Sequence, residues 1–223
     1  MPYRITPLVT DHYYHILNRG VAHQPTSLLA RDYERFLLCL SYYRHKDTPV
    51  RLSKLLQIPK DVRSKILERL ETSNNTIVEL LAYCCMPNHF HILLKQRFDG
   101  GVSSFMRKVT DSYTRYFNTK HKRVGPVFQG AFKAVHINNN EQLLHVSRYI
   151  HLNPLVSGVV RENDFLNFPW SSLGSYTNDK ISTFVNTQLV LENFRNTQKY
   201  LEFVRDQADY GKRLEEIKHL TFE

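Results

Sequence analysis

Two histidines separated by one residue form the most chemically suggestive spacing in the chain: His89 and His91 flank Phe90 within a run of strand-forming residues. Side chains two positions apart in a β-strand point to the same face of the sheet, so the two imidazoles converge. Two neutral imidazoles can bind a divalent metal and leave coordination positions open for a phosphate. The spacing also suits two surface histidines that are hydrogen-bonded to neighbours, and at this point both interpretations remain open.

A second polar group lies near the predicted end of a helix, where His145, Tyr149 and Asn153 recur at every fourth residue. This spacing places the three side chains on one side of the helix. A tyrosine phenol can act as a covalent nucleophile, but its ordinary pKa of about 10 means that it needs a base, a metal or a cation to help. Asn153 offers an oxygen one turn away. The alternative for Tyr149 is a packed side chain with a hydrogen-bonded hydroxyl.

The charge balance points to a polyanionic partner. The chain has 223 residues, with 30 Lys and Arg against 21 Asp and Glu, which gives a net charge of +9. The surplus is spread along the chain, which favours a folded basic surface for nucleic acid over a membrane surface or a disordered arm. The basic residues that bracket the two polar groups are Arg107, Lys108, Arg115, Lys120, Lys122, Arg123 and Lys133. They are consistent with a groove for a phosphate backbone, and the alternative is a solvated basic surface.

Hydrophobic periodicity predicts the elements that must position these residues. We expect strands at 10–18, 77–85, 89–95 and 131–137, and helices at 30–46, 102–118 and 141–152. The last of these should end near Asn153, because Pro154 disfavours a helical conformation in the residue before it. We also expect a helical insertion at about 49–75 and two short helices, at 187–194 and 198–207, C-terminal to these elements. The order predicts an α+β split βαβ sandwich with its helices on one face of an antiparallel sheet.

Composition excludes several classes of protein. With 42% hydrophobic residues the chain can bury a core, so general disorder is excluded. The sequence contains neither a membrane-spanning apolar run nor a signal peptide, which predicts a cytoplasmic protein. Its three cysteines, Cys39, Cys84 and Cys85, have no CxxC spacing and support neither a disulfide framework nor a cysteine-rich zinc site.

Taken together, the motifs resemble those of the single-tyrosine HUH transposases, especially the branch of REP-associated tyrosine transposases. The segments that carry the resemblance are Met-Pro-Asn-His-Phe-His-Ile-Leu-Leu at 86–94, Phe-Gln-Gly-Ala-Phe-Lys at 128–133 and Tyr-Ile-His-Leu-Asn-Pro at 149–154. Asn-Arg-Gly at 18–20 and Pro-Trp-Ser-Ser at 169–172 also fit. The resemblance covers roughly 10–176, so we expect one transposase domain at 1–176 and a helical C-terminal extension at 177–223.

The resemblance implies a ferredoxin-like HUH endonuclease that cuts single-stranded DNA beside a hairpin of a repeated palindromic element. Tyr149 would attack the scissile phosphate and give a 5′-phosphotyrosine intermediate, while His89, His91 and Asn153 would bind the metal. The implied metal is Mg²⁺ or Mn²⁺, although imidazole ligands are softer than Mg²⁺ prefers. Arg19 and Gln129 occupy motif positions and join the basic residues as expected DNA contacts. The resemblance also implies a bacterial, nucleoid-associated protein without a membrane partner, and leaves a homodimer open.

Two rival functions are distinguishable by experiment. The first is a catalytically idle descendant that binds nucleic acid as a regulator, against which the presence of all four site residues argues. The second is a metal phosphodiesterase without a covalent intermediate, which would tolerate the replacement of Tyr149 by Phe.

Overall fold

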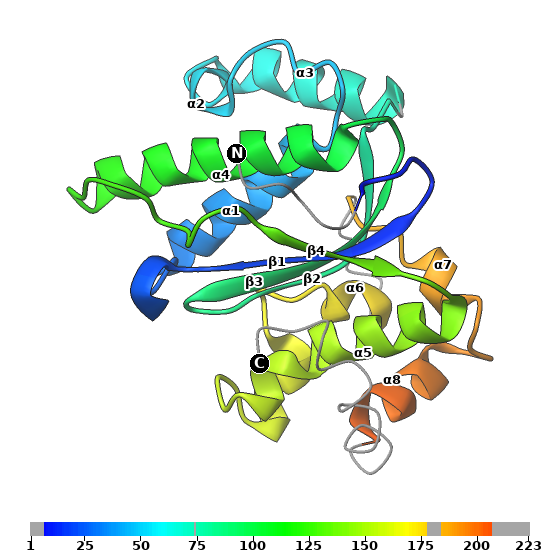
Figure 1. Ribbon diagram of the computed structural model, residues 1–223. Coiled ribbons are helices and arrows are strands. Elements are labelled where there is room, and N and C mark those ends of the chain that lie inside the picture. The colour runs from blue at the N-terminus through cyan, green and yellow to red at the C-terminus, as the bar shows by residue number, and fades with distance from the viewer. Residues whose placement is uncertain (1–6, 74, 178–183, 207–223) are drawn as a thin grey trace.

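A four-stranded antiparallel sheet forms the middle layer of the computed structural model, which describes residues 7–73, 75–177 and 184–206 (Figure 1). The strands are β1 (Tyr13–Arg19), β2 (Val78–Cys85), β3 (His89–Gln96) and β4 (Lys133–Ile137), in the order β2-β3-β1-β4. With its helices, the chain runs strand-helix-strand-strand-helix-strand, and β1 and β3 lie at the centre. This is the ferredoxin-like split βαβ arrangement, and it confirms the predicted α+β fold class.

The first strand begins later than the sequence predicts. Asp11 adopts a left-handed conformation with φ of 64°, so Thr10 and Asp11 form a turn before the strand begins at Tyr13. Within β1 the residues from Tyr14 to Asn18 are all buried, because helices cover both faces of the sheet. Tyr14 and Ile16 enter one core, and the intervening residues face the other.

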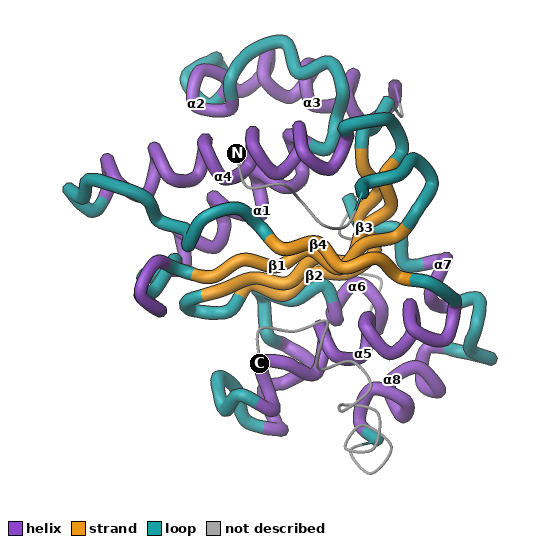
Figure 2. Tube along the Cα trace, in the orientation of Figure 1, coloured by secondary structure: helices purple, strands orange, loops and turns teal. Residues whose placement is uncertain are grey.

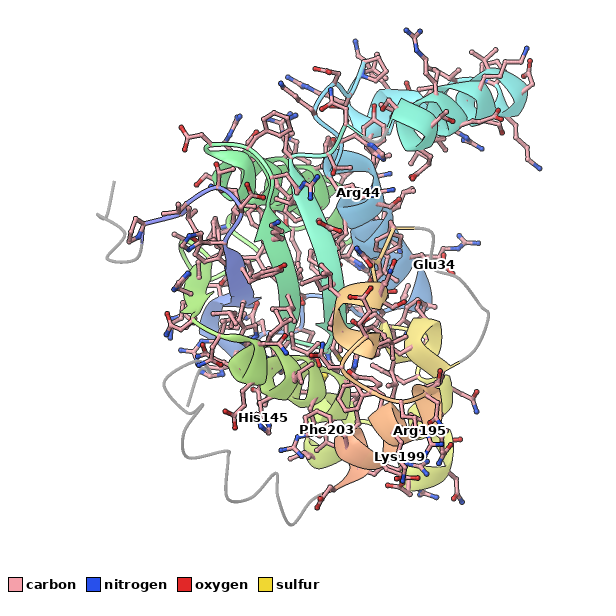
Figure 3. The ribbon with its side chains drawn as sticks, turned by 90° about the vertical axis from the view of Figure 1, so that its right-hand side faces the viewer. Glu34, Arg44, His145, Arg195, Lys199 and Phe203 are labelled. Atoms are coloured by element: carbon pink, nitrogen blue, oxygen red, sulfur yellow. The ribbon has the colours of Figure 1, made fainter. Side chains whose placement is uncertain are left out.

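The first face of the sheet is covered by α1 (Ala30–Tyr43) and α4 (Gly101–Lys120). Each helix buries apolar residues at spacings of three and four, such as Phe36 and Leu40 on α1 and Phe105 and Val109 on α4. The predicted insertion forms α2 (Leu52–Leu55) and α3 (Lys60–Ser73), which lie beyond these helices (Figure 1). Arg44, labelled at the end of α1 in Figure 3, forms an ion pair with Glu71 of α3 and so joins the insertion to the sandwich.

The second face is covered by α5 (Asn140–Val156), α6 (Leu173–Thr177), α7 (Gln188–Leu191) and α8 (Thr197–Arg205), as Figure 2 shows. The expectation that all helices lie on one face is therefore wrong. The sheet separates two hydrophobic clusters, and α5 packs on the second through residues such as Val146 and Ile150. The short helices expected at 187–194 and 198–207 correspond to α7 and α8, while residue 207 lies outside the described residues.

The helix α5 also runs past the predicted end at Asn153 and contains Pro154 within its last turn. Proline in a helix removes one backbone hydrogen bond and crowds the preceding turn. Here the buried side chains of Leu152 and Pro154 keep the chain helical, and the Ser157 backbone N–H donates to the carbonyl of Asn153. As a result, Asn153 stays in helical register one turn after Tyr149.

A buried polar network fixes α5 against its neighbours. The Tyr200 hydroxyl of α8 lies 2.6 Å from Nδ1 of His151 and 3.2 Å from the hydroxyl oxygen of Ser147, and both distances are hydrogen bonds. Nε2 of His151 bonds the Ser172 hydroxyl at 2.8 Å. Burial lowers the pKa of His151 to about 3, so its imidazole is neutral in this network. In Figure 3, His145 and Phe203 mark the same contact between α5 and α8, where their ring centroids are 5.4 Å apart.

The substitution Tyr200→Phe should destabilise the fold by about 1–3 kcal/mol, because it leaves the buried imidazole of His151 and the Ser147 hydroxyl short of a partner. Thermal unfolding should show this as a melting temperature lower by several degrees. Tyr13→Phe is the matched control, since the Tyr13 hydroxyl makes no hydrogen bond to a described residue, and we expect it to change stability by less than about 0.5 kcal/mol. Equal stability of the two variants would show that the network does not hold α5 in place.

No helix among the described residues is both long enough and apolar enough to cross a membrane.

Candidate active site

His89 and His91 lie on β3 and face α5, in the same alternating set as Leu93 of the second hydrophobic cluster. Nδ1 of His89 donates to Oδ1 of Asn88 at 2.7 Å. The amide of Asn88 is oriented by its own Nδ2, which donates to the backbone carbonyl of His23 at 3.4 Å. With its proton on Nδ1, His89 presents Nε2 as a lone pair.

A third histidine, His15 of β1, orients His91. Nε2 of His15 lies 3.0 Å from Nδ1 of His91, and both side chains are buried. This hydrogen bond leaves Nε2 of His91 as the outer atom, which is itself buried and makes no hydrogen bond to any described residue. His15 is not among the site residues predicted from the sequence. In the sequence, the only clue to its role is a histidine within the first strand. The pairing of β1 with β3, which sets Leu17 opposite His91, brings the two imidazoles together.

Tyr149 and Asn153 approach these histidines from α5. The Tyr149 ring lies edge-on to both His91 and His15, with centroid distances of 5.2 and 5.9 Å. Its side chain is partly exposed, so a substrate can reach it. One turn later, Asn153 contacts His89. The sheet and α5 thus bring together the four residues that the sequence singled out for metal binding and nucleophilic attack.

Burial keeps the imidazoles neutral. It lowers the pKa of His89 to about 4, against a smaller opposing effect from Asn153. It lowers the pKa of His91 well below the ordinary 6.5, and the neighbouring His15 and His89 lower it further. A neutral imidazole has the lone pair that metal binding requires.

The residues present fit a divalent metal. Two buried polar atoms at the site make no hydrogen bond to a described residue, Nε2 of His91 and Oδ1 of Asn153. Buried polar atoms rarely stay unpaired, so both suit a ligand. Within the described ranges no cluster of three His, Cys, Asp or Glu residues is arranged to hold a metal. The third protein ligand beside the two histidines would therefore be the amide oxygen of Asn153.

Three of the predicted DNA contacts border this site. Arg19 ends β1 opposite His89 in the strand register, and its Nε donates to Oε1 of Gln129 at 2.7 Å. Lys133 begins β4 opposite Leu17 and is exposed. The strand register thus places Arg19 opposite His89, and Lys133 opposite Leu17, which itself pairs with His91, so both cations lie near this end of the sheet.

The other predicted DNA contacts lie elsewhere. Arg107, Lys108 and Arg115 project from α4, which covers the face of the sheet opposite to Tyr149. Lys122 and Arg123 lie in the loop after α4, where the Arg123 guanidinium donates to Oε1 of Gln24 at 3.2 Å. The predicted DNA contacts therefore lie in more than one region of the surface, and their binding to a phosphate backbone stays a prediction.

Comparison with known proteins finds one similar family model and a similar solved structure. Residues 54–153 match the model of the family described as Transposase IS200 like. The fold matches the solved structure of a REP-associated tyrosine transposase bound to a REP hairpin, with a TM-score of 0.54 and 15% identity over 83% of this chain and 91% of the other. A comparison with curated proteins gives no match. The resemblance to the single-tyrosine transposases is thus confirmed.

Proposed function

We propose that this chain, with an IS200-like transposase pattern over residues 54–153 and the fold of a hairpin-bound tyrosine transposase, is a metal-dependent endonuclease and strand transferase for single-stranded DNA. One observation carries the proposal above all: a partly exposed tyrosine meets two neutral imidazoles, and the outer nitrogen of His91 has no protein partner among the described residues. The proposed substrate is a single strand flanked by a DNA hairpin, and the solved structure of similar fold is that of a transposase bound to a REP hairpin.

In the proposed reaction, the Tyr149 phenol loses its proton and its oxygen attacks the scissile phosphorus. A phosphotyrosyl bond to the 5′ end of the downstream fragment forms as the bond between the phosphorus and the 3′ oxygen of the upstream fragment breaks. That oxygen takes up a proton to become a 3′-hydroxyl. One phosphodiester replaces another, so a second 3′-hydroxyl can reverse the step without ATP. The products are a covalent protein–DNA adduct and a free 3′ end.

His89, His91 and Asn153 would hold the metal, Mg²⁺ or Mn²⁺, through two imidazole nitrogens and one amide oxygen. When bound, the cation would polarise and position the scissile phosphate. Arg19 and Lys133 contribute positive charge beside the same phosphate, and Gln129 holds the Arg19 side chain in place.

The proposal is tested by incubating the protein with a DNA hairpin that carries a single-stranded flank, in the presence of Mg²⁺ or Mn²⁺. We expect strand cleavage together with a protein–DNA band that survives denaturation. Binding without cleavage across a panel of hairpins would favour the idle regulator instead.

His15 should control the affinity of the metal site, because its hydrogen bond holds His91 with Nε2 outward. Replacing a residue that orients a metal ligand typically weakens metal affinity about 10–100-fold, and we expect His15→Phe to do the same for Mn²⁺ measured by calorimetry. His15→Gln should retain part of the affinity, because its amide oxygen can accept from Nδ1 of His91. His12→Phe, at an exposed histidine just before β1, is the control, and we expect less than about a twofold effect. Unchanged affinity in His15→Phe would show that His15 does not orient the site.

A further inference from the structure

The turn between β2 and β3, which leads into the first histidine of the site, is held by a segment that is distant in sequence. The carbonyl of Pro87 accepts the backbone N–H of Thr26 at 2.8 Å, and the carbonyl of Asn88 accepts that of Gly20 at 2.7 Å. Figure 1 shows the blue turn after β1 beside the turn that joins β2 and β3. We call the segment 20–27 the clamp, because it fixes the residues just before the histidine.

The backbone in the middle of the clamp is strained. Ala22 and His23 adopt left-handed conformations, with φ of 51° and 58°, which cost free energy in residues other than glycine. Gly20 permits the tight turn, because a Cβ atom there would lie 2.0 Å from the carbonyl oxygen of Gln24. Strain of this kind persists only where the surroundings impose it, and it is often found beside functional sites. Here it directs the His23 carbonyl toward Asn88, whose Nδ2 donates to that carbonyl at 3.4 Å.

The His23 carbonyl decides which end of the Asn88 amide faces His89. A carbonyl oxygen can only accept a hydrogen bond, so the amide nitrogen of Asn88 must face it, and Oδ1 must face the other way. Oδ1 lies 2.7 Å from Nδ1 of His89. Because an amide oxygen also can only accept, the proton of the neutral imidazole must be on Nδ1. The conformation of the clamp thus determines a tautomer.

We propose that Asn88 is a positioning residue that selects the metal-binding tautomer of His89, and that the clamp selects the orientation of Asn88. The inference rests on the proposed function for the metal, and it gives the strained turn a role. Without the Asn88 amide, the imidazole can carry its proton on Nε2, and that proton must then move before a metal binds there. The clamp also follows Arg19 directly, so the segment that supports the metal ligand is continuous with an expected phosphate contact.

The first test replaces Asn88. We expect Asn88→Ala to weaken Mn²⁺ binding about 10–100-fold in calorimetry, the usual effect of removing the partner that orients a metal ligand. In the metal-free protein, nitrogen-15 NMR of the imidazole should show that His89 changes from the Nδ1 tautomer to a mixture of both tautomers. Asn88→Asp should rescue the site, because a carboxylate oxygen still accepts from Nδ1. We expect it to keep the Nδ1 tautomer and an affinity within about threefold of that of the intact protein.

The second test changes the clamp. His23→Pro fixes φ at about −65° and excludes the left-handed conformation, so we expect Mn²⁺ binding to be about tenfold weaker. His23→Gly keeps that conformation, removes only an exposed imidazole and should stay within about twofold of the intact protein. Both oxygens of a carboxylate accept, so Asn88→Asp no longer depends on the clamp for its orientation. In that background, His23→Pro should weaken binding by less than about threefold.

The matched control for Asn88→Ala is Asn138→Ala. Oδ1 of Asn138 also lies 2.7 Å from Nδ1 of a histidine, His136, but this contact is exposed and lies outside the site. We expect the tautomer of His89 to be unchanged and the affinity for Mn²⁺ to stay within about twofold.

An unchanged tautomer in Asn88→Ala would overturn the inference. Equal losses of affinity in Asn88→Ala and Asn88→Asp would also overturn it, because Asn88 would then act only in the fold. Equal affinities in His23→Pro and His23→Gly would overturn the role of the clamp. Melting curves establish which variants fold, and the two Asn88 variants decide the positioning role even where His23→Pro does not fold.

The chemistry is measured separately, because the tautomer is observed in the metal-free protein without DNA. A changed tautomer and weaker Mn²⁺ binding in Asn88→Ala, together with no covalent adduct in the intact protein, would support the positioning role and contradict the proposed reaction. An adduct in the intact protein, together with an unchanged tautomer in Asn88→Ala, would do the reverse.

Discussion

The substitution Tyr149→Phe is expected to abolish both DNA cleavage and the covalent adduct, a decrease on the order of 10⁴-fold or more. The change removes one oxygen atom, which is the proposed nucleophile, and keeps the ring that lies edge-on to His91 and His15. The fold should therefore be unchanged, and the affinity for hairpin DNA should stay within about twofold of that of the intact protein. A denaturing gel with labelled hairpin DNA measures both products at once.

The control for this variant is Tyr33→Phe, which makes the same change at a tyrosine stacked on Trp170. Tyr33 lies on α1, on the other face of the sheet, and we expect full cleavage activity. Cleavage that survives in Tyr149→Phe would identify the enzyme as a hydrolase that activates water, and the tyrosine would then be a packing residue.

The second large effect is expected for His89→Ala combined with His91→Ala. Hydrogen bonds occupy Nδ1 of both imidazoles, and Nε2 of each is the proposed metal ligand, so the double variant should lose metal binding and, with it, all detectable cleavage. Because the basic residues remain in place, hairpin binding should change by less than about threefold. Calorimetry with Mn²⁺ and the cleavage gel give the two readings.

His12→Ala combined with His136→Ala provides a control with the same change in composition. These two histidines also contact each other, with Nδ1 of His12 at 2.7 Å from Nε2 of His136, but they lie outside the site and their contact is exposed. Full metal affinity and cleavage are expected in this control. Retained cleavage in the His89/His91 variant would exclude a metal held by these residues from the mechanism.

The sequence predicted most of the site because its signals are local. The two-residue period of a strand places His89 and His91 on one face, and the helical period places Asn153 one turn after Tyr149. Both geometries are present in the structure. The end of α5 could not be predicted from Pro154 alone, because the burial of Leu152 and Pro154 outweighs the local preference for a break.

The sequence could not predict which elements meet in space. Arg107, Lys108 and Arg115 precede the site residues of α5 in sequence, yet α4 and α5 cover opposite faces of the sheet. His15 reaches His91 only because β1 pairs with β3. The contact between His151 and Tyr200 spans 49 residues and depends on how α8 docks. Such non-local pairings follow from strand order and layer packing, which periodicity along one chain does not encode.

The central claim is that Tyr149 forms a covalent bond to DNA, and the most direct measurement is to find that bond. Flanked hairpin DNA labelled at its 3′ end is incubated with the protein and Mn²⁺, the denatured adduct is digested with protease, and the modified peptide is identified by mass spectrometry. We expect the labelled strand to be attached through a 5′ phosphate to Tyr149, and the released fragment to end in a 3′-hydroxyl. Attachment at another residue, or cleavage without any attached DNA, would contradict the claim.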